Sequence, residues 1–136
     1  MTTIQFNQHA DLAAAKKHHQ DRIDSKAGDV RQRFARDWLL DEEYTLAANQ
    51  AQVYADNSYS GNAPEAVQAW ADAAGMSAQA ATDDILATRQ TYNAALEKVR
   101  RIRLTAKQQV TQVTTVRAAF DAAETAVANL DAVVPQ

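Results

Sequence analysis

The chain has no cysteine, and its 136 residues include only three glycines and two prolines. Without cysteine there are no disulfides, no thiolate catalysis and no cysteine-ligated metals. Sheet proteins need many turn residues, so the shortage of glycine and proline argues against a β architecture. No apolar run approaches the roughly 18 residues of a membrane span, and the first residues lack the basic-then-apolar layout of a secretory signal.

The abundant residue is alanine, which occurs 30 times. An alanine-rich chain with few turn residues has a high helix propensity, so we expect an all-α fold. The formal net charge is −3, which provides no general attraction to nucleic acid or to an anionic membrane. The length suits a single helical domain over residues 8–136.

The first helical pattern follows a short segment with strand-like alternation. Residues 1–7 are expected to form an extended N-terminal arm, in which Ile4 and Phe6 lie on the same face. From about residue 8 to residue 57 apolar residues recur at helical spacing. Gly28 is the one interruption, and it leaves two possibilities open, a bend in one helix or a break between two.

Capping residues predict the helices that follow. A short helix is expected over residues 63–74, with Asn62 as its N-cap, Pro64 in its first turn and Gly75 just past its end. Ser77 then offers the N-cap of a last helix over residues 78–132, because neither glycine nor proline occurs again before Pro135.

A heptad repeat runs through this last stretch and favours one continuous helix. Its two sets of seam positions are Ile85, Tyr92, Val99, Ala106, Val113, Phe120, Val127 and Val134, and Thr88, Ala95, Ile102, Gln109, Val116, Ala123 and Leu130. The expected architecture is an elongated helical bundle or coiled-coil hairpin with one very long C-terminal helix. A seam of this length predicts self-association or a partner helix. The expected interface residues are Ile4, Phe6, Tyr92, Val99, Ile102, Val113, Val116, Phe120 and Val127.

No constellation of residues indicates catalysis. His18 and His19 point about 100° apart on a helix, so they are read as solvated side chains and not as a metal site. The acids of residues 41–43 and 83–84 have no partner at working geometry and are read as solvated faces. We therefore expect no enzyme, no cofactor and no metal.

The middle of the last helix carries a basic zone that could contact nucleic acid or acidic side chains. It consists of Arg89, Lys98, Arg100, Arg101, Arg103 and Lys107. The acidic net charge argues against nucleic acid. Pairing with acids of residues 37–43, or with an acidic partner, is the preferred interpretation. The aromatic residues occur at helical spacing and are assigned to the core, including Tyr44, Trp70 and Phe120.

Residues 27–34, Ala-Gly-Asp-Val-Arg-Gln-Arg-Phe, resemble the Ala-Gly-x-x-Arg-x-Arg-aromatic opening of small alanine-rich helical modules encoded in the tail regions of bacteriophages and prophages. Further similar segments follow in the same order at residues 42–44, 69–71, 75–77, 81–86 and 102–107. The similarity covers about residues 26–110. Two features depart from the pattern: residues 37–41 are expected to continue as helix where the family often has a Pro-Gly connection, and Ala47 replaces a lysine.

This resemblance implies a virion structural protein of the tail, baseplate or tail-fibre region that acts by protein–protein contact, with no catalytic residues to carry over. Its partners would be other phage structural proteins and further copies of itself, with no membrane. The alternative is a tail-fibre assembly chaperone that is absent from the mature particle. The two functions imply different locations, the tail region of the virion or the host cytoplasm during assembly.

Overall fold

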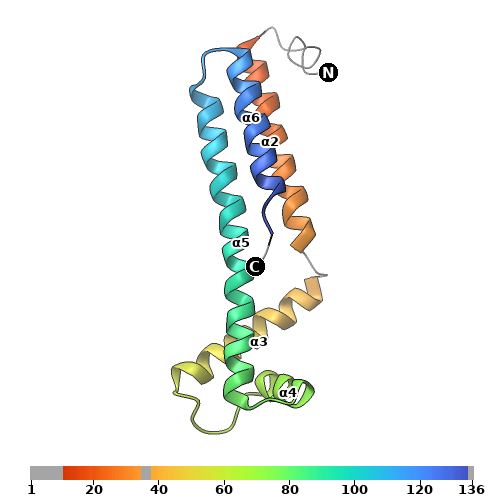
Figure 1. The fold of residues 1–136 in the computed structure, drawn as a ribbon, viewed down its shortest axis with the longest axis vertical. Coiled ribbons are helices and arrows are strands. Elements are labelled where there is room, and N and C mark those ends of the chain that lie inside the picture. The colour runs from red at the N-terminus through yellow and green to blue at the C-terminus, as the bar shows by residue number, and fades with distance from the viewer. Residues whose placement is uncertain (1–10, 35–37, 135–136) are drawn as a thin grey trace. The chain divides into compact units, whose positions relative to one another are not determined.

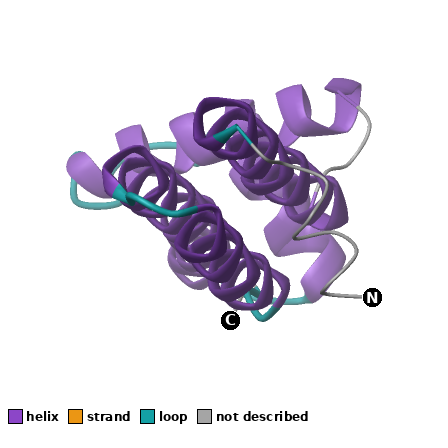
Figure 2. Ribbon diagram, turned by 90° about the horizontal axis from the view of Figure 1, so that it is seen from above, coloured by secondary structure: helices purple, strands orange, loops and turns teal. Residues whose placement is uncertain are grey.

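The computed structural model describes residues 11–34 and 38–134, and all regular secondary structure in these ranges is α-helix (Figure 1, Figure 2). The helices are α2 (Leu12–Phe34), α3 (Trp38–Asp56), α4 (Glu65–Ala74), α5 (Ala78–Gln112) and α6 (Val116–Asp131). The all-α prediction is thus confirmed for the described part of the chain. None of these helices is long and apolar enough to cross a membrane.

The described chain divides into two compact units. The bundle unit consists of Met1–Phe34 and Ala94–Gln136, and the 35–93 unit consists of Ala35–Asn93. Helix α5 contributes to both. At 1.5 Å per residue its 35 residues extend about 50 Å, which is longer than one small core, so different helices pack on its two parts.

The bundle unit places α2, the second part of α5 and α6 side by side (Figure 1). Lys16 of α2 bonds to Thr111 and Asp24 bonds to Arg103, so α2 and α5 run antiparallel. The α5–α6 connection reverses the chain again, which makes α6 parallel to α2. The core of this unit consists of alanines and a few larger apolar residues, namely Ile23, Ala27, Val30, Ala95, Val99, Ala106, Val110, Ala119, Ala123, Ala126, Leu130 and Val133.

The prediction of one very long C-terminal helix is wrong. The long helix α5 ends at Gln112, and α6 starts at Val116 after a reversal that contains neither glycine nor proline. Thr115 has an extended backbone, and its hydroxyl accepts a hydrogen bond from the N–H of Ala118, so it is an N-cap within the expected helix. A heptad stripe is compatible with a hairpin as well as with a continuous helix, because both need one apolar face.

The first helical region, expected over residues 8–57 with a possible break at Gly28, consists of two helices whose boundary lies elsewhere. Helix α2 continues through Gly28 and ends at Phe34, and α3 begins at Trp38. A Cβ atom at Gly28 would approach only the side chain of Arg31, at 3.9 Å, so the backbone there is ordinary helix. The neighbouring Ala27 and Val30 are fully buried, and this packing outweighs the modest helix propensity of glycine.

The 35–93 unit has a small core where α3, α4 and the beginning of α5 meet. Its buried residues are Ala51, Tyr54, Val67, Ala71 and Ala81. The α3–α4 loop is held by Tyr59, whose ring lies edge-on to Tyr54 and whose hydroxyl donates to the Asp83 carboxylate at 2.6 Å. This hydrogen bond raises the pKa of Tyr59 above its ordinary value. Ser58 and Tyr59 both have φ = 57°, a left-handed conformation that permits this tight loop.

The ends of α4 only partly follow the capping prediction. The helix begins at Glu65 with Pro64 as its N-cap residue, whereas Asn62 was expected in that role. Gly75 has φ = 67° and terminates the helix as predicted, and the N–H of Met76 donates to the carbonyl of Ala71. The Ser77 hydroxyl then accepts from the N–H of Ala80, which confirms Ser77 as the cap of α5.

Two basic residues of α5 in the bundle unit pair with an acid of α2, which was not among their expected partners. Arg103 and Lys107 both bind the carboxylate of Asp24, at 3.3 and 2.7 Å. Burial alone would raise the pKa of Asp24, but the hydrogen bonds from Lys107 and Arg103 outweigh it and hold the pKa below its ordinary value. This cluster therefore stabilises the α2–α5 contact in its ionised form.

A second carboxylate joins the end of α6 to α2. Asp131 binds Lys26 at 2.9 Å and also Arg33. The hydrogen bonds from Arg33 and Lys26 lower the pKa of Asp131 to about 2. Arg22 similarly reaches Glu124 of α6 at 2.8 Å.

His19 was expected to be solvated, but its side chain is only 1% exposed. Its ring lies edge-on to the ring of Phe120, with centroids 5.7 Å apart. Arg22 donates to Nδ1 of His19 at 3.0 Å and lies over the same Phe120 ring. Because a guanidinium can only donate, Nδ1 acts as the acceptor here. His19 is thus a packing residue between α2 and α6.

Replacing Phe120 by alanine should lower the free energy of unfolding by about 3–5 kcal/mol, because the ring is 3% exposed and supports His19 and Arg22. Urea unfolding followed by circular dichroism measures this change. The control is Leu104→Ala on α5, whose side chain is 39% exposed and whose loss should change stability by no more than about 0.5 kcal/mol. Equal effects of the two substitutions would contradict the placement of Phe120 in the core.

The pKa of Asp131 predicts an acid-sensitive contribution to stability. The pKa is depressed from 3.8 to about 2 in the folded chain, so the contribution is complete above about pH 5 and is lost as the pH falls toward 2. Asp131→Asn should therefore lower stability at pH 7 and flatten its decrease between about pH 4 and pH 2. Urea unfolding at a series of pH values tests this, with the exposed Asp29 on α2, changed to Asn, as control. If Asp131→Asn left the pH dependence of the free energy of unfolding unchanged, the acid-sensitive contribution would not come from Asp131.

Candidate protein-interaction groove

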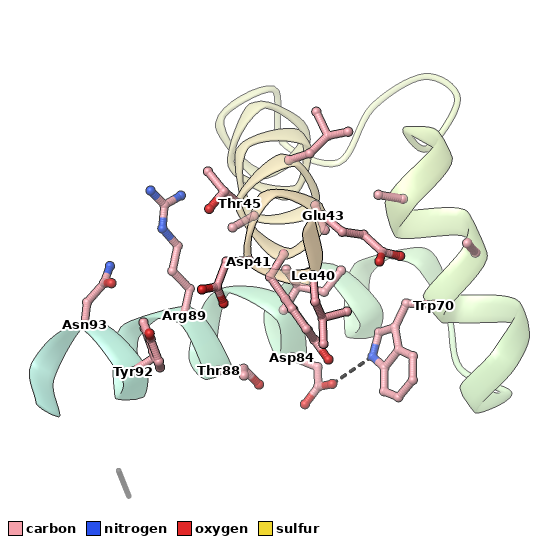
Figure 3. Close-up of a pocket in the computed structure, with 17 residues that line it drawn as sticks. Leu40, Asp41, Glu43, Thr45, Trp70, Asp84, Thr88, Arg89, Tyr92 and Asn93 are labelled. Atoms are coloured by element: carbon pink, nitrogen blue, oxygen red, sulfur yellow. Dashed lines mark hydrogen bonds between the residues drawn. The ribbon is translucent and has the colours of Figure 1, made fainter. Parts of the chain in front are cut away.

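A groove of about 730 Å³ lies within the 35–93 unit. Helix α3 provides one wall, α5 runs along the bottom and α4 closes one end (Figure 3). Four alanines of α3 and α4 line it together with larger apolar side chains: Ala47, Ala48, Ala66 and Ala69. Small side chains at these positions leave the room that a ligand would fill.

The wall formed by α3 presents large apolar side chains to the groove. Leu40, Tyr44 and Leu46 all line it, and Tyr44 and Leu46 are 47% and 57% exposed. On the same helix Val53 is 67% exposed, yet it does not line the groove. The buried side of α3 is formed instead by Ala51 and Tyr54. Helix α3 therefore has apolar residues on more than one face, and only one of these faces is covered within the unit.

Trp70 of α4 lies at the end of the groove and is held by a hydrogen bond. Its indole N–H donates to the Asp84 carboxylate of α5 at 2.8 Å, as Figure 3 shows. The ring is 41% exposed, so the bond fixes the orientation of an aromatic surface that solvent still reaches. A ring with one anchored polar end and an open apolar face is typical of protein interfaces.

The charged side chains that line the groove give it a net negative charge. Its described lining includes three carboxylates, those of Asp41, Glu43 and Asp84, against the one guanidinium of Arg89. Arg89 donates to the side-chain oxygen of Asn49 at 3.3 Å and so points along α3. A ligand in this groove would meet apolar surface bordered by net negative charge.

The position of α4, and with it of Trp70, depends on a side chain of α3. Pro64, the N-cap residue of α4, makes no side-chain capping bond. The carboxamide oxygen of Gln50 accepts the N–H of Ala66 at 2.9 Å and thereby satisfies a backbone donor in the first turn of α4. Gln50 thus caps α4 from a different helix, which no local sequence rule would have found.

The polar groups that line the groove include hydroxyls as well as carboxylates. Its described lining contains the hydroxyls of Thr45, Thr88, Tyr44 and Tyr92 but no histidine or lysine that could act beside its carboxylates as a general base. Within residues 11–34 and 38–134, no group of three or more histidine and acidic side chains could hold a metal ion. The groove therefore offers apolar surface and hydrogen-bonding groups.

The expected interface residues that the structure describes are divided between the two units. Tyr92 lines the groove, whereas Val99, Ile102, Val113 and Phe120 belong to the bundle unit. Val99 is fully buried and Phe120 nearly so, which means that helices of the same chain already cover them. Val116 and Val127 are half-buried on α6, and Ile4 and Phe6 lie outside the described residues. The hairpin is the reason for the difference: α5 and α6 bury much of the stripe against each other and α2.

Sequence reasoning missed Tyr44, Leu46 and Trp70, and it assigned both aromatic residues to the core. A signal was present in α3, where large apolar residues at positions 40, 44, 46, 53 and 54 spread around the helix. A helix of a small two-layer unit can bury only one stripe, so some of these residues had to remain exposed.

Comparisons with known proteins found no matching protein-family model, no matching curated protein and no matching solved structure.

Gln50→Ala should destabilise α4 by about 0.5–2 kcal/mol, the usual cost of losing a helix N-cap. Hydrogen exchange of the amides of α4 should accelerate correspondingly, while exchange in α2 and α6 stays unchanged. Gln50→Glu keeps the acceptor oxygen and places negative charge near the helix N-terminus, so it should restore protection. Equal exchange in the alanine variant and the unsubstituted chain would show that Gln50 does not cap α4.

Proposed function

We propose that the protein is a phage structural component of the tail, baseplate or tail-fibre region, and that it acts through protein–protein contact at the groove of the 35–93 unit. The phage assignment rests on the resemblance of residues 26–110 to alanine-rich tail-region modules. The mode of action rests on the groove. In this proposal the chain is a binding and positioning element and carries out no reaction.

The observation that carries the proposal is the exposure of Leu46 and Trp70 in one concave surface. Both are large, both line the groove, and they are 57% and 41% exposed. Fully burying an exposed leucine side chain contributes about 1.5–3 kcal/mol, and because Leu46 and Trp70 are already about half covered, a partner seated here would gain about 1–3 kcal/mol from covering the rest. The hydrogen bond between Trp70 and Asp84 orients the ring in advance, which reduces the entropy cost of binding.

The bundle unit supports this role as a rigid spacer. Its core is continuous along α2, α5 and α6, and its helices are linked by ion pairs at Asp24, Glu124 and Asp131. Such a unit can hold an attached binding site without taking part in binding. A salt-dependent contact with nucleic acid is not favoured, because Arg103 and Lys107 of the basic zone are engaged by Asp24.

Leu46→Gln tests the proposal against Val53→Gln. Both substitutions replace an exposed apolar residue of α3 by a neutral helix former, but only Leu46 lines the groove. Incorporation of each variant into purified phage particles is measured by quantitative immunoblotting. We expect Leu46→Gln to reduce incorporation about tenfold, which is the effect of losing 1.4 kcal/mol of contact, and Val53→Gln to leave it unchanged.

Two outcomes would contradict the proposal. Equal incorporation of the two variants would show that the groove is not the contact surface. Absence of the unsubstituted chain from particles, together with its co-purification with unassembled fibre protein, would establish the chaperone alternative in place of a structural component.

A further inference from the structure

We infer that the groove of one copy binds residues 1–6 of a second copy, with Ile4 and Phe6 seated on its apolar surface. The inference rests on the proposed function of the groove as a protein-contact surface and names the occupant. The groove exposes large apolar side chains, and residues 1–6 are a segment of this chain whose apolar residues fit that surface.

The apolar pattern of the segment matches the groove. In an extended chain Ile4 and Phe6 lie on the same face, about 7 Å apart. The groove presents Tyr44, Leu46 and Trp70 to such a pair. Aromatic and aliphatic side chains of this size bury large apolar areas when they meet, and this burial supplies most of the binding energy.

The lengths also agree. Along α5 the groove extends from Asp84 to Asn93, ten residues whose first and last Cα atoms are about 14 Å apart along a helix. Four extended residues, positions 3–6, span about 13 Å. An extended segment leaves backbone donors and acceptors open, and the side chains of Thr88 and Asn93 along the groove can bond to them.

The negative charge of the groove lining disfavours binding of acidic segments. The described lining has three carboxylates, those of Asp41, Glu43 and Asp84, and one guanidinium, that of Arg89. Residues 1–10 contain no acidic side chain, and His9 is their one ionisable side chain. An acidic segment would be repelled at this border, whereas residues 1–10 would not.

A groove suits this segment better than a strand edge would. A segment with strand-like alternation can bind by adding to a sheet, but residues 11–34 and 38–134 contain no strand with an open edge. Each copy then provides one segment and one groove. The contact is head-to-tail, and it builds a ring or an open chain of copies according to its rotation angle.

The first test compares four variants of the full chain by sedimentation velocity over a range of concentrations. The segment variant is Ile4→Gln/Phe6→Gln, with Thr3→Gln on the opposite face of an extended chain as its control. The groove variant is Tyr44→Gln/Leu46→Gln, with Val53→Gln as its control. The unsubstituted chain and both controls should assemble alike. The segment and groove variants should assemble about a hundredfold more weakly, with unchanged helix content by circular dichroism.

The decisive test mixes the two defective variants. The segment variant still has an intact groove, and the groove variant still has an intact segment. The mixture should form one-to-one heterodimers and nothing larger, because it contains a single functional pairing and the remaining segment and groove cannot extend the chain.

Three outcomes overturn the inference: an unsubstituted chain that is monomeric at every concentration, a segment variant that assembles normally, or a mixture that forms no heterodimer. Particle incorporation separates these failures from failure of the proposed function. If Leu46→Gln still loses incorporation while the segment variant enters particles normally, the groove binds another protein, so the proposed function stands and the inference falls.

Discussion

Close packing of helices through alanine is the constraint on which the rest of the structure depends. Half of the twelve buried core residues of the bundle unit are alanines. Alanine lets helix axes approach closely, since the distance between packed helices is set by the side chains at the contact. It also buries little apolar area, so each helix pair gains less from the hydrophobic effect than a leucine-rich pair would.

This constraint explains the many polar links between the helices of the bundle unit. The Lys16 ammonium donates to the carbonyl of Thr111, one of the last four carbonyls of α5, where the helix dipole favours a positive charge. Gln20 donates to the carbonyl of Lys107 one turn earlier. Asp24 continues the series with Arg103 and Lys107. These long side chains bond α2 to α5 at successive turns and so favour one alignment of the two helices along their length.

In the 35–93 unit some large apolar residues lie in the core and others remain exposed. In the 35–93 unit Val67 and Tyr54 form much of the core, while Leu46 and Trp70 remain at the surface beside small alanines. The proposed contact surface rests on the exposure of these two residues in the groove. Gln50 and Asp84 hold its shape by bonding to α4.

Local sequence signals located the elements whose ends depend on local chemistry. Gly75 has the left-handed conformation that glycine adopts most readily, and Ser77 caps the next helix, as their order in the sequence predicted. The same reasoning overlooked Thr115, because threonine is common inside helices and becomes a cap only when the chain reverses there. It also misplaced the ionic partners of α5, since Asp24 is nearly 80 residues away from Arg103 in the sequence.

Composition and periodicity alone determined that this protein is helical and that long amphipathic stripes build its core, because propensity and spacing act over a few turns of chain. Only the tertiary structure decided where the stripe folds back, which residues of α3 are covered, and which acids the basic residues meet. Those outcomes depend on which faces of distant helices pack against each other, and a periodic pattern that fits a hairpin as well as a continuous helix does not contain that information.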